Sequence, residues 1–170
     1  LKVYLDELSK KEIEKLVVEL YQSNKFNQEL IGNKIHPEDE ESKLEKYKRI
    51  IRDEFFPERG DGKLRYAVMR KALSNFKKIS KKPKNIADLM LCYVENGVEF
   101  TNEFGDIDDN FYTKMGNMFA DSLKYIFDHG LEKLFDERCL KIKLESENIG
   151  WGFSDYLDQL YWTYYDYQIE

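Results

Sequence analysis

Residues 83–100, PKNIADLMLCYVENGVEF, decide the fold class of this chain. Placed at 100° per residue, as on an α-helix, their apolar side chains cover more than half of the circumference. The narrow polar stripe that remains consists of Asp88, Cys92, Glu95 and Glu99. A helix that is apolar on most sides is packed on most sides, so this stretch predicts a central helix in an all-α protein.

The rest of the chain continues the helical periodicity between start and stop signals such as the Ser9 and Glu12 capping box, Pro57 and Gly130. About seven helices are predicted, over roughly 9–24, 37–57, 62–80, 83–100, 109–129, 131–147 and 153–167. Short connections favour antiparallel neighbours. We therefore expect a stack of helical hairpins, either a helical bundle or a short α-solenoid.

The size and composition of the chain predict a single helical domain over residues 1–170, because 42% apolar residues can fill one core and no Gly/Ser-rich linker divides it. No apolar run reaches the roughly 20 residues of a membrane span, and no signal peptide opens the sequence. We expect a cytoplasmic protein without membrane contact. Cys92 and Cys139 are too few for a disulfide framework and are expected to be reduced core thiols.

Positive charge is concentrated in segment 59–84, where ten basic residues accompany a single acid, Asp61. The segment carries +9 in a chain of net charge −6, so the remainder carries −15. Such a field steers anionic partners or satisfies the protein's own acids. Binding of an anion or a nucleic acid through segment 59–84 is therefore one hypothesis, although the acidic net charge and the lack of aromatics on the basic face make nucleic acid unlikely.

A glycine-containing turn at the start of this segment is a candidate anion-binding site. Its residues lie at a predicted helix N-terminus, where free backbone N–H groups and the helix dipole attract anions. They are Arg59, Gly60, Gly62, Lys63 and Arg65. The spacing is not that of a P-loop, and a plain interhelical turn is the alternative.

Two arginines fall by angle on apolar helix faces, Arg65 on the predicted helix 62–80 and Arg138 on the predicted helix 131–147. An unpaired guanidinium there would cost several kcal/mol, so each must reach past the core to water or pair with a carboxylate. The candidate buried ion pairs involve Arg65, Arg138, Asp88, Glu95 and Glu99, with loop 106–109 as a further source of acids for Arg65.

The same charged residues would have to supply any catalytic site. Glu95 and Glu99 are four residues apart on one helix, where like charges raise each other's pKa. With Arg65 and the Asp106 loop they form the alternative hypothesis of an enzyme. A solvated edge or an ion-pair seam is the simpler interpretation, and no catalytic residue is assigned.

No cofactor motif is found, and no metal site is predicted. His36 and His129 lack a second ligand at metal-binding spacing. Asp106, Asp108 and Asn110 begin a calcium-loop pattern that is not completed, so helix capping is expected there.

Aromatic residues crowd the predicted last helix, 153–167. Its expected buried stripe is Phe153, Leu157, Leu160 and Tyr164. Trp162 and Tyr165 then point outward, as amphipathic aromatics do at protein-binding hot spots. Packing against the N-terminal segment is the alternative. A homodimer is the simplest source of a partner for this surface.

Five separate strings resemble a known family: EFFP at 54–57, RG at 59–60, GKLR at 62–65, YVENGVEFT at 93–101 and GWGF at 150–153. The chain from about Leu44 onward is similar to a family of short bacterial proteins catalogued only as a domain of unknown function. The resemblance implies a helical bacterial protein and brings no activity, substrate or catalytic residue. The residues themselves favour a protein-interaction module that binds another protein or a second copy.

Overall fold

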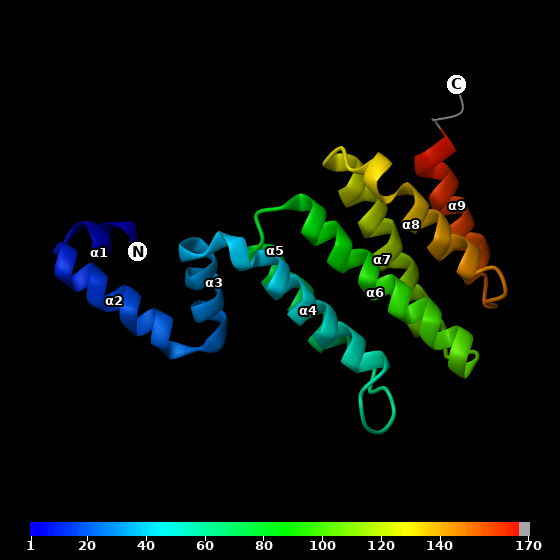
Figure 1. Ribbon diagram of the computed structural model, residues 1–170, viewed down its shortest axis with the longest axis horizontal. Helices are drawn as coiled ribbons and strands as arrows, with labels where there is room; N and C mark the ends of the chain where they lie inside the picture. Colours follow the sequence, from blue (N-terminus) through cyan, green and yellow to red (C-terminus); the bar gives the residue numbers. More distant parts are fainter. Residues whose placement is uncertain (167–170) are drawn as a thin grey trace. The chain divides into compact units, whose positions relative to one another are not determined.

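The computed structural model describes residues 1–166, except for the side chain of Glu38 (Figure 1). The described residues form nine α-helices and one 310 helix, with no strand, which confirms the all-α prediction. Contacts divide the chain into two units, unit 1 (Leu1–Glu41) and unit 2 (Ser42–Glu170). A single domain over 1–170 stays a prediction. None of the described helices is both long and apolar enough to cross a membrane.

Unit 1 contains α1 (Lys2–Asp6), α2 (Lys10–Ser23), α3 (Lys25–Ile35) and η1 (Pro37–Asp39). The capping box at the start of α2 is confirmed, because the backbone N–H of Ser9 donates to the Glu12 carboxylate at 2.8 Å and Glu12 N donates to Ser9 Oγ at 3.4 Å. The sequence analysis did not predict α1 and α3. The helix α1 spans one turn, and α3 is started by a cap in which Asn24 accepts a hydrogen bond from Asn27 N.

Unit 2 contains the C-terminal part of α4 (Glu40–Phe55) and all of α5 (Tyr66–Ile79), α6 (Pro83–Phe104), α7 (Asp109–Asp128), α8 (Glu132–Glu145) and α9 (Phe153–Tyr165). The helix α6 packs against α5, α7 and α8, while α9 packs against α7 and α8. Figure 1 shows α6 and α7 running side by side. The helices of unit 2 therefore form a bundle around α6.

The central position of α6 follows from its composition. Leu89, Leu91 and Val94 are fully buried, and Gly97 lets α7 approach closely, since a Cβ there would lie 2.2 Å from Met115 Sδ. The helix runs four residues beyond the predicted end. It stops at Gly105, whose φ of +86° favours glycine.

One predicted helix begins later than expected. The helix expected over 62–80 begins only at Tyr66, because the preceding residues form a loop packed on the end of α4. Leu64 N donates to Glu54 O at 2.9 Å, which holds the loop in place. The last helix was expected to reach Tyr167, and that residue lies outside the described part of the chain.

Substitution of Gly62 by alanine is expected to lower the free energy of unfolding by about 2 kcal/mol. A Cβ at this position would lie 2.3 Å from the carbonyl oxygen of Phe55, and backbone cannot move aside as a flexible side chain can. Urea denaturation measures the effect. The matched control is Gly32→Ala on α3, where nothing lies within 4 Å and no loss is expected. Equal stabilities for the Gly62→Ala variant and the wild type would contradict this packing.

Candidate functional site

An ion cluster joins three helices of unit 2. Arg138 on α8 donates to Asp88 Oδ1 at 2.5 Å and to the two carboxylate oxygens of Glu95 at 2.5 and 2.7 Å. Both acids lie on α6, and Lys48 of α4 contacts Asp88 at 2.9 Å. The Arg138 side chain is 27% exposed, so its charge is largely removed from water. The structure thus places Arg138 with two of the acids that the sequence proposed for it.

A second cluster lies one turn further along α6. Arg52 of α4 donates two hydrogen bonds to the Glu99 carboxylate, at 2.7 and 2.9 Å, and one to Asn96 Oδ1 at 2.7 Å. Hydrogen bonding from Arg52 lowers the pKa of Glu99 below its usual range. The repulsion expected between Glu95 and Glu99 does not set this pKa, because each carboxylate has its own arginine.

Lys48 and Glu95 of the first cluster and the three residues of the second line a groove of about 620 Å³ between α4, α6 and α8. Four basic and four acidic residues surround it, so its charges balance. Cys92 lies in the lining, and burial raises the pKa of its thiol to about 11, which leaves it protonated and unreactive at neutral pH. The groove has the chemistry of an ion-pair seam, without a free general base.

Arg65 differs from its prediction in both place and partner. It is the N-cap residue of α5, its side chain is 56% exposed, and its guanidinium pairs with Glu54 at 2.6 and 2.9 Å. The predicted partners on α6 and in loop 106–109 do not reach it. The error has a simple cause: Arg65 precedes the helix, so the helical angle assigned to it does not apply.

Glu54, in the last turn of α4, is the partner of Arg65 that was not predicted from the sequence. Its side chain is 3% exposed and also accepts a hydrogen bond from Arg65 N at 3.0 Å. These bonds link the last turn of α4 to the first residue before α5. The sequence signal that could have identified this pair is an acidic residue, Glu54, at the C-terminal end of a predicted helix, followed by a glycine-containing loop with Arg65 at its end.

The hydrogen bonds from Arg65 lower the pKa of Glu54 in the folded protein. A carboxylate with a lowered folded-state pKa contributes stability that is complete above its unfolded pKa, about 4.3, and is lost as the pH falls through the folded value. We therefore expect the stability advantage of the wild type over Glu54→Gln to shrink as the pH falls from about 6 to 3.

Urea denaturation at several pH values in that range measures this advantage. The control is Glu58→Gln, an exposed acid of the same loop, which should show no such trend. An advantage of the wild type that stays constant, or grows, on acidification would contradict the assignment to Glu54.

The loop does not form the open anion cradle that the sequence suggested. Arg59, Lys63 and Arg65 line a pocket of about 280 Å³ together with three acids, Asp53, Glu54 and Glu58. The helix N-terminus begins after Arg65, and Gly62 packs against the backbone of Phe55 rather than facing solvent. A site with as many acids as cations offers little net attraction to an anion.

The residues of the enzyme hypothesis are not brought into one site. Arg65 pairs with Glu54, Glu95 with Arg138 and Glu99 with Arg52, while Asp106 accepts a hydrogen bond from Tyr112 Oη at 3.1 Å. In addition, Asp108 caps α7 by accepting from Phe111 N at 2.7 Å, as expected for a capping residue. Within the described chain, no cluster of His, Cys, Asp and Glu side chains could hold a metal ion.

The aromatic surface predicted on α9 is only partly present. Trp162 is 41% exposed, and its indole N–H donates to Asp158 at 3.2 Å. The prediction that Tyr165 also faces outward is wrong, because this side chain is 4% exposed and packs against Phe127 and Tyr161. The buried stripe of α9 is Phe153, Leu157, Tyr161 and Tyr165, so the predicted stripe was rotated by one position in its second half.

Unit 1 also exposes apolar side chains. None of its described apolar side chains is buried. The α2 residues Val17, Leu20 and Tyr21 are 44%, 49% and 41% exposed. Exposed apolar side chains that gather on one helix face mark an interaction site, so we treat the α2 stripe of Ile13, Val17, Leu20 and Tyr21 as the candidate interface.

Comparisons with known proteins add a family and no activity. A model of a family of unknown function (DUF6155) matches residues 1–164. The match includes both units, and therefore the α2 stripe. No curated protein and no solved structure matches the chain.

Proposed function

The chain belongs to a family of unknown function (DUF6155), and from the surface that unit 1 exposes we propose that it is a protein-interaction module that binds a second copy of itself. The observation that carries the proposal is the absence of buried apolar side chains among the described residues of unit 1. A unit of about 40 residues rarely has enough core to be stable alone and usually needs a staple or an oligomeric partner.

The spacing of the α2 stripe suits a helical partner. Ile13, Val17 and Leu20 recur at intervals of four and three residues, the spacing by which one helix packs its seam against another. Two copies related by a two-fold axis would each cover the stripe of the other, so the same surface would be buried on both copies. This self-complementarity favours a second copy over an unrelated protein.

The charges of α2 favour an antiparallel pair. Lys10 lies at the start of α2 on the side of the stripe, and the last turn of α2 contains no basic residue. In an antiparallel pair, Lys10 of each copy would lie near the C-terminal end of the partner helix, where the helix dipole attracts a cation. A parallel pair would instead bring the two Lys10 ammonium groups together.

A disulfide test follows from this arrangement. With the two-fold axis passing near Val17, the two copies of a Val17→Cys variant would face each other within bonding range, so mild oxidation should give a covalent dimer. The native thiols of Cys92 and Cys139 are buried and should not interfere.

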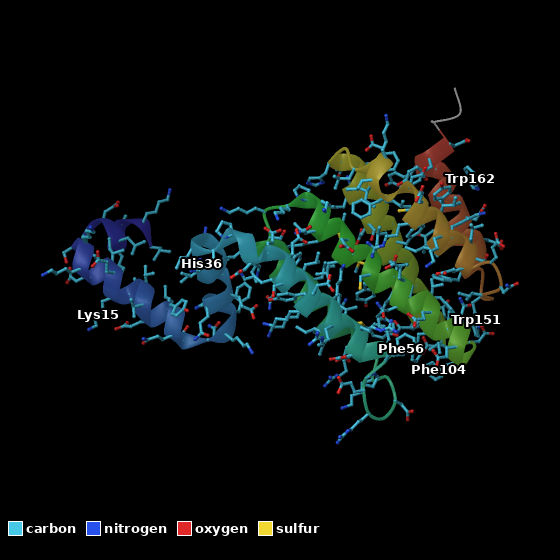
Figure 2. The ribbon with its side chains drawn as sticks, in the orientation of Figure 1. Lys15, His36, Phe56, Phe104, Trp151 and Trp162 are labelled. Atoms are coloured by element: carbon cyan, nitrogen blue, oxygen red, sulfur yellow. The ribbon has the colours of Figure 1, made fainter. Side chains whose placement is uncertain are left out.

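The matched control is Lys15→Cys. Lys15, labelled in Figure 2, lies about 160° from Val17 around α2, and its side chain is 79% exposed. It should form much less covalent dimer than Val17→Cys. Equal crosslinking of the two variants, or none in either, would contradict the proposed interface.

A further inference from the structure

A second surface, in unit 2, is independent of the proposed self-association. It lies at the turn between α8 and α9, where Trp151 stands between two glycines. Trp151 is 63% exposed and has a φ of +59°, a conformation that is costly for a bulky residue. Strain of this kind persists where the surrounding structure holds it, and it is concentrated at functional sites.

The turn is held firmly on both sides. Phe153, the first residue of α9, is buried, and its N–H donates to Gly150 O at 3.1 Å. The ring of Trp151 stacks with that of Tyr112 on α7 at 6.5 Å and 25°. Tyr112 is fixed in turn, because its hydroxyl contacts Thr101 Oγ1 at 2.8 Å. The indole is thus displayed on a rigid support.

Beside the indole lies a groove of about 330 Å³ between α7 and the start of α9. Four aromatic residues form part of its lining: Tyr112, Trp151, Phe153 and Tyr156. The other side is a polar stripe of α7, with Asp109, Thr113 and Asn117 at intervals of four residues. No basic residue lines this groove.

Three aromatic rings elsewhere in the chain lie close to a basic side chain. Lys143 lies 5.9 Å from the ring centre of Trp162, Lys114 lies 4.4 Å from that of Tyr66, and Arg52 lies 4.7 Å from that of Phe56. Figure 2 shows Trp151 and Trp162 at different ends of α9. Trp151 is 63% exposed and lines the same groove as Asp109, so the groove combines an aromatic ring with a carboxylate.

We propose that this groove binds a small quaternary ammonium compound, held by the faces of Trp151 and Tyr156 and by the charge of Asp109. The aromatic faces are electron-rich and attract a cation, and a methylated ammonium also gains from contact with their apolar surface. Asp109 adds the opposite charge, while Thr113 and Asn117 can bind a hydroxyl group on the ligand. The volume lies within the range of small-molecule sites.

Choline and its neutral analogue 3,3-dimethyl-1-butanol test the proposal, since they have nearly the same shape and differ in charge. The chain contains two tryptophans, so a ¹H–¹⁵N spectrum contains two indole N–H signals. Choline should shift the Trp151 signal in a saturable manner with a Kd of about 1 mM and leave the Trp162 signal in place. The neutral analogue should bind at least about tenfold more weakly.

Three variants accompany the titration. Trp151→Ala should abolish binding as followed by backbone amides of α7, and Asp109→Asn should weaken it about threefold or more. Trp162→Phe should leave the Kd unchanged. Equal binding of choline and the neutral analogue would overturn the proposal, as would binding of methyl glucoside in place of choline or no shift at about 50 mM choline.

Discussion

Replacing Arg138 with methionine is expected to lower the free energy of unfolding by about 3 kcal/mol. Methionine keeps most of the length and apolar contact of the side chain but removes the charge. Asp88 and Glu95 would then lose the guanidinium that binds them both, at positions only 19% and 32% exposed. Glu95 would lose its ion-pair partner, while Asp88 would keep only Lys48, and the cost of these underpaired, partly buried carboxylates dominates the change. Chemical denaturation at neutral pH measures it.

Two further variants show whether the charge is responsible. Adding Asp88→Asn and Glu95→Gln to Arg138→Met should recover more than half of the loss, because the triple variant leaves no unpaired charge. The exposed Arg70→Met on α5 is the matched control and should change stability by less than about 0.5 kcal/mol. A similar loss in the single and triple variants would instead assign the effect to packing.

The prediction from sequence was most successful where periodicity alone decides the structure. The apolar circumference of 83–100 predicted that α6 would be central, and its polar stripe predicted which acids would face another helix. Arg138 lies within a regular helix, so its helical angle was meaningful. Arg65 lies before α5, and no helical angle describes a residue in a loop.

Other features depend on contacts that a single sequence does not express. Glu54 meets Arg65 because Gly62 lets the loop turn back onto α4, a close approach that spacing does not reveal. On α9, Tyr165 is buried because it stacks on Tyr161 and its hydroxyl donates to Glu132 O of α8 at 3.3 Å, and these contacts are not visible in the sequence.

The change with the largest expected effect on self-association is Leu20→Glu. In the proposed antiparallel pair the Leu20 side chains of both copies are buried. The substitution therefore places two carboxylates in the interface. We expect the dissociation constant of the dimer to rise at least about 100-fold, or about 2.7 kcal/mol. Lys15→Glu also introduces a carboxylate, but on the far side of α2, and should change the dissociation constant by no more than a few-fold. Circular dichroism should show unchanged helix content in both variants.

Sedimentation equilibrium of the wild-type chain over a range of concentrations, alongside Leu20→Glu and Lys15→Glu, tests the self-association most directly. The proposed interface predicts a reversible monomer–dimer equilibrium for the wild type and for Lys15→Glu, and a monomer for Leu20→Glu at the same concentrations. A wild-type chain that is monomeric at every concentration, or a dimer that Leu20→Glu leaves intact, would contradict self-association through α2.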